Sequence, residues 1–277
     1  SGALAFPRIQ GADLCGRVVA IGPGVADLPL GARVICPVNQ HEPTAENPIR
    51  FLSIGSEFDG AFAQYCLVKA RHLHDVSASP LSDVEIGAMP CAYGTAHNLL
   101  TRAQVAVGER VLVTGASGGV GLAAVQLALL RGAEVTAQCS LSKAAPLSAM
   151  GAQVLARDST PPARRFDVVI DVFGGDGFQD RLDALCPGGR YATSGAVAGP
   201  HVAGDLRRIY LNDLTLYGAT HQPREVFAGL VTIINTARIR PVVSQTYPLR
   251  DIARAQDDLA AGRYPGKLVL VPPESQP

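Results

Sequence analysis

Three glycines at regular spacing, Gly115, Gly118 and Gly121, occur in the stretch RVLVTGASGGVGLAAVQLALLRGAEV. An apolar run typical of a strand precedes them, and a run typical of a helix follows. In that setting glycine allows a tight turn, close approach of the backbone to a pyrophosphate and close packing of helix on strand. The free N–H groups at the helix start also favour an anion. The spacing predicts a dinucleotide-binding loop; the alternative is a purely structural glycine-rich turn.

The choice between the two nicotinamide cofactors is expected about 20 residues after the loop, where an Asp or Glu would bind the ribose hydroxyls of NAD. The sequence there reads QCSLSK at positions 138–143 and contains no acid. Ser140 and Lys143 instead offer a hydroxyl and a cation that suit a 2′-phosphate. We therefore expect NADP(H), although Lys143 taken alone is equally well explained as an ordinary solvated lysine.

Strands and helices must alternate around this loop to position it. The strands expected from Arg110 onward have continuous apolar character, as strands buried on both faces do: 111–114, 134–138, 154–156, 168–172, 189–193 and 215–218. Helical patterns separate several of them. The order predicts an α/β fold, a Rossmann-type doubly wound parallel sheet.

The first third of the chain has a different texture. Short strands are expected at 17–21, 33–36 and 61–68, separated by glycine and proline turns, and residues 39–53 are expected to form a surface loop. Ser82 with Glu85 three residues later predicts a capping box that starts helices leading into the second domain. The ending, GKLVLVPP, returns to strand character.

Composition bounds the class of protein. The chain has 277 residues, 24 Lys plus Arg against 24 Asp plus Glu, and six cysteines without a C-x-x-C pair. Zero net charge argues against nucleic acid and anionic membrane surfaces as partners. No apolar run approaches a membrane span, and the amino-terminal residues lack a basic start followed by an apolar run. We expect reduced thiols and a cytoplasmic protein.

Five segments, in this order, resemble the medium-chain dehydrogenase/reductase superfamily and in particular its zinc-independent quinone oxidoreductase branch. They are FPRIQGADLCGRVVAIGPGV, GSEFDGAFAQYCLV, TGASGGVG, FDVVIDVFGG and GKLVLVP. The resemblance implies a Rossmann domain, residues 96–242, inserted in a GroES-like, mainly β catalytic domain formed by residues 1–95 and 243–277. It also implies NAD(P)(H) and a homodimer. Some sixty or more residues precede the P-x-I-x-G motif in the family and six do here. We expect either an incomplete part of the protein or a naturally shortened one, in which residues that line the relatives' substrate pocket have no counterpart.

The resemblance also assigns residues to the cofactor. It implies pyrophosphate contacts from the glycine loop, nicotinamide contacts from Thr95 and from the turns after the fourth and fifth strands, and a further contact near the end of the chain. These residues are Ser117, Gly118, Gly119 and Val120 for the pyrophosphate, Phe173, Gly174, Ser194 and Gly195 near the nicotinamide half, and Lys267.

Zinc is not expected. Zinc alcohol dehydrogenases of this superfamily bind the catalytic metal with an early Cys, the His of a G-H-E segment and a later Cys. Here that segment reads Gly11-Ala12-Asp13, and Cys91 alone falls on a ligand position, whereas a catalytic zinc needs three protein ligands. An acid at the position of Asp13 is often structural in relatives.

Without a Lewis acid, conjugate reduction fits better than alcohol oxidation. We expect a hydride transfer from NADPH to a quinone, an enone or an enoyl thioester. Tyr93, Thr95 and His97 lie where the chain enters the nucleotide domain, and ligands commonly bind at such junctions. Tyr93 or His97 is a candidate hydrogen-bond or proton donor, and packing is the alternative for both. A zinc-free alcohol or aldehyde dehydrogenase and a non-catalytic NADPH-binding sensor or structural protein are the competing functions.

Overall fold

The computed structural model describes residues 5–273, which divide into two compact units. One unit comprises residues up to Gly94 and from His221 onward, and the other is the intervening segment Thr95–Thr220. The resemblance places the return to the first unit at residue 243. The segment from 221 joins it earlier because α7 (Arg224–Asn235) packs on β5 (His74–Asp75), where the rings of Phe227 and His74 lie 5.0 Å apart.

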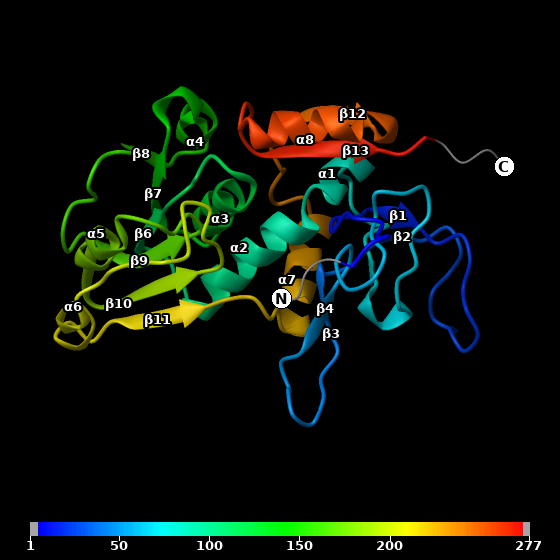
Figure 1. Ribbon diagram of the computed structural model, residues 1–277, viewed down its shortest axis with the longest axis horizontal. Coiled ribbons are helices and arrows are strands. Elements are labelled where there is room, and N and C mark those ends of the chain that lie inside the picture. The colour runs from blue at the N-terminus through cyan, green and yellow to red at the C-terminus, as the bar shows by residue number, and fades with distance from the viewer. Residues whose placement is uncertain (1–4, 274–277) are drawn as a thin grey trace. The chain divides into compact units, whose positions relative to one another are not determined.

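The second unit is a six-stranded parallel sheet in the order β11-β10-β9-β6-β7-β8 (Figure 1). Its strands are β6 (Arg110–Val113), β7 (Glu134–Cys139), β8 (Gln153–Ala156), β9 (Phe166–Asp171), β10 (Leu185–Thr193) and β11 (Thr215–Gly218). All six expected strands are confirmed, with ends shifted by up to four residues. The chain proceeds outward from β6 through β8 and then crosses to β9 on the other side, which places the topological switch point between β6 and β9.

Helices connect these strands. They are α2 (Pro90–Arg102), which enters the unit, α3 (Gly119–Leu130), α4 (Ala145–Ala149), α5 (Phe178–Asp183) and α6 (Leu206–Tyr210), with a 3-10 turn η2 (Leu141–Lys143). α3 packs on β6 and β7, and α5 packs on β10. α3 is apolar all round and seven of its residues are buried, as expected for a helix pressed against the sheet.

The first unit contains short strands. β1 (Gly16–Arg17), β2 (Arg33–Ile35) and β5 form an antiparallel sheet, β3 (Asn39–His41) pairs with β4 (Phe51–Ser53), and β12 (Val243–Pro248) pairs in parallel with β13 (Lys267–Val271). Its helices are α1 (Asp83–Gly87), α7 and α8 (Ile252–Ala260), with 3-10 turns η1 (Ala70–His72) and η3 (Leu249–Asp251). The Ser82–Glu85 capping box is confirmed.

Three expectations for this unit are wrong. The strand expected over 17–21 ends at Arg17, because the chain leaves the ladder for the Gly22–Gly24 turn. The expected surface loop 39–53 is a hairpin, with only its tip, residues 42–50, outside the ladder. Residues 61–68 have strand-like composition, but beyond the amides of Ala61 and Phe62, which donate to the carbonyls of Gly11 and Gln10, they form no ladder in the described part of the chain. A strand requires a partner for its backbone groups, which composition alone does not supply.

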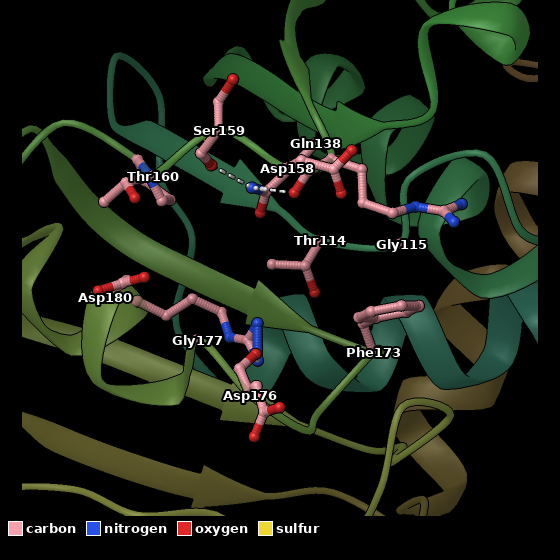
Figure 2. Close-up of a pocket in the computed structure, with 13 residues that line it drawn as sticks. Thr114, Gly115, Gln138, Asp158, Ser159, Thr160, Phe173, Asp176, Gly177 and Asp180 are labelled. Atoms are coloured by element: carbon pink, nitrogen blue, oxygen red, sulfur yellow. Dashed lines mark hydrogen bonds between the residues drawn. The ribbon is translucent and has the colours of Figure 1, made fainter.

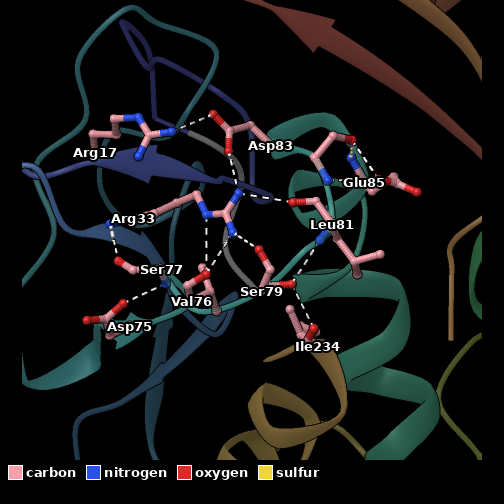
Figure 3. Close-up of polar contacts among 11 residues, drawn as sticks. Arg17, Arg33, Asp75, Val76, Ser77, Ser79, Leu81, Asp83, Glu85 and Ile234 are labelled. Atoms are coloured by element: carbon pink, nitrogen blue, oxygen red, sulfur yellow. Dashed lines mark hydrogen bonds and ion pairs between the residues drawn. The ribbon is translucent and has the colours of Figure 1, made fainter. Parts of the chain in front are cut away.

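A largely buried arginine, Arg33, connects segments of the first unit (Figure 3). Arg33 on β2 donates from Nη2 to the carbonyl of Val76 at 2.9 Å and from Nη1 to the carbonyl of Leu81 at 3.0 Å, and it also reaches the carbonyl of Ser79. Its Nη1 lies 3.0 Å from Asp83, the first residue of α1. One side chain thus positions the segment that leads into α1 and α2. Within residues 5–273 no helix has the length and apolar character to span a membrane.

Candidate functional site

The glycine loop connects β6 to α3, as the spacing predicted. Gly115 has a φ of +58°, a conformation that favours glycine. A Cβ on Gly121 would lie 2.3 Å from the carbonyl oxygen of Gly115, so helix and turn touch through their backbones. Gly118 caps α3 without a side-chain hydrogen bond, which leaves the first-turn amides of Gly119, Val120 and Gly121 available to an anion. The local geometry therefore fits a dinucleotide pyrophosphate.

A pocket opens beside this loop at the carboxyl ends of the strands (Figure 2). Figure 2 shows Thr114 near its centre, Phe173 and Asp176 to one side, and Gln138 and Asp158 to the other. Its lining comes from the turn after β6, from β7, from the segment after β8, from the turn after β9 and from α5, which contributes Asp180 and Arg181. This is the switch point of the sheet, where doubly wound proteins bind their ligands.

A buried carboxylate lies beneath the pocket. Asp171, at the end of β9, is fully buried and accepts hydrogen bonds from Thr114 Oγ1 at 2.5 Å and from the Tyr191 hydroxyl. Its Oδ2 lies 3.0 Å from Nε of Arg181. Burial alone would raise the pKa of Asp171, but these hydrogen bonds and the Arg181 charge hold it below its usual value. The carboxylate is therefore ionised at neutral pH.

The two residues expected at a 2′-phosphate follow β7. Ser140 caps η2 and its Oγ lies 3.0 Å from Oγ of Ser142, while Lys143 ends the same turn. Neither lines the pocket. Gln138 does, and its Nε2 donates to the carbonyls of Arg157 and Ser159 at 3.2 and 2.9 Å. The end of β7 thereby holds the segment that follows β8.

Arg157 is a cation that sequence reasoning missed. It lines the pocket and its guanidinium lies 5.7 Å from the centre of the Phe173 ring. The side chain is exposed, and none of the ion pairs found across residues 5–273 involves it. A guanidinium with no carboxylate partner at the rim of a pocket suits a phosphate. The missed signal was the run of charged and hydroxyl residues, RDST at 157–160, directly after a strand.

The turns after β9 and β10 lie against each other. The amide of Ala198 donates to the carbonyl of Phe173 at 2.8 Å, and the amide of Gly175 donates to the carbonyl of Gly199 at 3.0 Å. A Cβ on Gly195 would lie 2.8 Å from the carbonyl oxygen of Val172. Phe173, which follows β9, lines the pocket together with Arg157, which follows β8, so the pocket extends across the switch point. Contact of Phe173 with the nicotinamide half stays a prediction from the resemblance.

The three candidates on α2 have different surroundings. Tyr93 is 1% exposed and hydrogen-bonds to the backbone of Val242, and burial raises its pKa, so the phenol stays protonated. Nη2 of Arg131, the C-cap of α3, lies 3.3 Å from Nδ1 of His97. Burial and that charge lower the pKa of His97 to about 4, so its ring is neutral at pH 7. Thr95 is half-buried.

His97 and the glycine loop lie at opposite ends of α3. The loop begins this 12-residue helix and Arg131 ends it, and the helix rises about 1.5 Å per residue. This placement favours a packing role for His97.

In the first unit the structure brings together Asp13, Cys91 and Lys267. Nζ of Lys267 lies 2.8 Å from Oδ2 of Asp13, and the amide of Cys91 donates to the other oxygen at 2.6 Å. Burial raises the pKa of the Cys91 thiol to about 11. The carboxylate is already satisfied by an ammonium and an amide, and Ala12 has no ligating atom. Across the described residues no group of three or more His, Cys, Asp or Glu could hold a metal ion. These residues do not fit a catalytic zinc.

Comparisons with known proteins agree with this architecture. The alcohol dehydrogenase GroES-like domain family matches residues 2–78, and the zinc-binding dehydrogenase family matches residues 150–270. Acryloyl-coenzyme A reductase from Metallosphaera sedula is 31% identical over 96% of this chain and 83% of its own length.

Solved structures extend the comparison. A putative alcohol dehydrogenase from Sinorhizobium meliloti 1021 has a TM-score of 0.91 and 42% identity, covering 99% of this chain and 78% of that one. The 2-octenoyl-CoA carboxylase reductase CinF, in complex with NADP and 2-octenoyl-CoA, has a TM-score of 0.87 and 25% identity, covering 97% and 69%. With its parallel sheet, glycine loop and GroES-like unit, the chain belongs to the medium-chain dehydrogenase/reductase superfamily.

Proposed function

We propose that this protein is an NADPH-dependent oxidoreductase that reduces an activated C=C bond or a quinone without a metal. The observation that carries the proposal is the pocket at the switch point, bounded by the glycine loop and by the unpaired Arg157. The relatives named acryloyl-coenzyme A reductase and 2-octenoyl-CoA carboxylase reductase support the C=C substrate class, and the NADP in the latter structure supports the cofactor.

The residues of the chain have distinct parts in this proposal. The amides at the start of α3, with Ser117, bind the pyrophosphate, and Arg157, Ser140 and Lys143 bind the 2′-phosphate. Asp158 and Asp176 offer acceptors to ribose hydroxyls and the adenine amino group. Thr95, Phe173, Gly174, Ser194 and Gly195 lie toward the nicotinamide half. Their surroundings favour packing roles for Tyr93 and His97 and a structural ion pair for Lys267.

When bound, the cofactor supplies a hydride from its nicotinamide. The reaction balances as hydride addition to the electrophilic β-carbon of an enone or enoyl thioester and protonation of the resulting enolate. A quinone accepts the hydride and a proton to become the hydroquinone. The protein needs to orient the ring and the acceptor and to exclude competing water.

The test measures NADPH oxidation by purified protein against matched panels of quinones, enones and enoyl thioesters, with zinc content measured on the same sample. We expect turnover on at least one panel, unchanged after exhaustive chelation. Oxidation of simple alcohols by NADP⁺ in the absence of any reduction would instead establish the second candidate, a zinc-free alcohol dehydrogenase. The similarity to a putative alcohol dehydrogenase from Sinorhizobium meliloti supports that candidate. Tight NADPH binding without turnover on any substrate would point to a sensor or structural protein.

We further propose a cytoplasmic homodimer that forms through the edge strand β11. Leu216 on β11 is 40% exposed, and Leu206 and Tyr210 on α6 and its C-cap Leu211 are each more than 60% exposed. An uncovered edge with an apolar border is a template for pairing, and two-fold pairing closes the assembly. Light scattering at micromolar concentration should give about twice the 28.9 kDa chain mass. Leu216→Pro should yield a folded monomer; a wild-type mass near that of one chain would refute the dimer.

A further inference from the structure

Arg181 contributes to the pocket in a way that the sequence did not reveal. Its side chain is 6% exposed and its partner Asp171 is 0% exposed. Nη2 of Arg181 donates to the carbonyl of Gly174 at 2.7 Å and contacts the carbonyls of Gly175 and Asp176 at 3.3 and 3.2 Å. One guanidinium therefore contacts three successive carbonyls in the turn that follows β9.

The same turn is held by its amides. The amides of Phe173 and Gly174 donate to Oδ1 of Asp171 at 2.9 and 3.0 Å. Asp171 and Arg181, an ion pair, thus bind the two kinds of backbone group in one short segment. Gly174 and Gly175 have φ values of +67° and +65°, a conformation that favours glycine.

This turn borders the site on two sides. Phe173, which begins it, lines the pocket opposite Gln138. The backbone bonds to Ala198 and Gly199 attach the turn to the segment after β10, which contains Ser194 and Gly195. A shift of residues 173–176 would therefore move both the Phe173 wall of the pocket and the segment expected at the nicotinamide half.

We infer that Arg181 is a positioning residue of the dinucleotide site: paired with the buried Asp171, it fixes the turn 173–176 and through it the Phe173 wall and the segment after β10. The inference rests on the proposed cofactor site. Arg181 also lines the pocket, so a measurement made without the cofactor is needed to separate positioning from direct contact. A buried ion pair that served stability alone would often be replaceable by packed apolar groups. Here Nη2 contacts the three carbonyls while Nε faces Asp171, an arrangement of separate donors that a guanidinium provides and a single ammonium does not.

Arg190 provides a matched control in the same unit. It pairs with Glu109 and donates to the carbonyls of Ala103 and Gln104 at 2.8 and 3.2 Å, its side chain is 18% exposed, and it does not line the pocket. The variants are Arg181→Lys, Arg181→Met, Arg190→Lys and Arg190→Met. Both pairs should lower the melting temperature.

The affinity for NADPH should distinguish the role of Arg181 from that of Arg190. We expect Arg181→Lys to raise the dissociation constant of NADPH about tenfold or more, because small displacements of binding groups have large effects, and Arg190→Lys to change it less than about twofold. If Arg181→Met does not fold, Arg181→Lys, which keeps the charge beside Asp171, still decides the question. Equal changes for the two lysine variants would overturn the inference.

A second measurement does not depend on the cofactor. The chain contains no tryptophan, so Phe173→Trp makes a single fluorescent reporter of the turn. In that background Arg181→Lys should increase quenching of the reporter by acrylamide, and Arg190→Lys should not. Unchanged quenching would overturn the inference even if affinity falls. If the wild-type protein does not bind NADPH, the proposed function fails while the quenching result still tests the role of Arg181.

Discussion

Arg33 in the first unit and Arg181 in the second use the same chemistry. Each directs a guanidinium at three backbone carbonyls and at one aspartate. The aspartates differ: the side chain of Asp83 is 53% exposed, whereas that of Asp171 is 0% exposed. The segments differ as well, because residues 76–83 carry the chain into α1 whereas residues 173–176 border a pocket. The comparison shows that a fold-stabilising contact becomes functional through the segment it holds.

The largest expected effect is on the first unit. Arg33→Met leaves the carbonyls of Val76, Ser79 and Leu81 without this donor, which should lower the free energy of unfolding by about 3–5 kcal/mol. Arg17 is the control, since its side chain is 56% exposed and reaches Asp83 at 3.4 Å; Arg17→Met should cost less than about 0.5 kcal/mol. Urea denaturation measures both. Under conditions in which Arg33→Met is folded, its affinity for NADPH should equal that of the wild-type protein. A changed affinity would contradict the proposed difference in role between Arg33 and Arg181.

A substitution in the glycine loop should lower the affinity for NADPH more than it lowers the stability of the fold. Gly121→Ala places a Cβ 2.3 Å from the Gly115 carbonyl oxygen, so the loop must move. We expect NADPH affinity to fall about 100-fold, as for other small displacements at a binding site. Gly16→Ala, in the first unit, meets nothing within 4 Å and is the control. Calorimetric titration with NADPH tests the pair, and wild-type affinity in Gly121→Ala would exclude the loop from the site.

Cofactor choice should depend on Arg157 more than on Lys143. Arg157→Gln removes the pocket cation and should weaken NADPH about tenfold while leaving NADH nearly unchanged. Lys143→Ala should show the same selectivity to a smaller extent. Arg165→Gln changes an exposed arginine outside the pocket and serves as the control. Equal losses of affinity for NADPH and NADH would contradict the proposed 2′-phosphate site. Tighter binding of NADH than of NADPH by the wild-type protein would contradict the predicted preference for NADPH.

The smallest expected effect is a dependence on pH in the first unit. Burial alone would raise the pKa of Glu42, but hydrogen bonds from Lys69, His72 and Arg71 lower it to about 2. A carboxyl whose pKa is depressed in the folded state contributes stability above its unfolded pKa of 4.5, and loses it as the pH falls from there toward 2. The loss should be about 1 kcal/mol, since Lys69 and Arg71 are half-exposed and screened.

Glu42→Gln tests this dependence. The variant should be less stable at pH 7, and its stability should fall less steeply between pH 4.5 and 2 in parallel urea titrations. Identical slopes for the variant and the wild-type protein would assign the acid sensitivity to other carboxylates, such as Asp171.

The sequence by itself determined the parallel sheet and the glycine loop. Both depend on local signals: apolar runs of strand length, helical periodicity and glycines at positions that exclude a Cβ. Such signals act between residues that are close in sequence, and the strands from β6 to β11 followed them closely. The first unit was less predictable because its strands are two to three residues long near the amino terminus, and residues 61–68 show that a strand-like composition needs a partner.

Tertiary structure alone decided how the pocket is lined and what supports it. Arg157 meets Phe173, and Asp171 meets Thr114, Tyr191 and Arg181, across separations of up to 57 residues that no local pattern records. The tertiary structure also decided that Lys267 forms an ion pair with Asp13, which lies 254 residues away in the sequence. Parallel strands bring their carboxyl ends to one edge of a sheet whatever their order in the sequence. Which side chains converge there therefore depends on the strand order, which the chain acquires only when it folds.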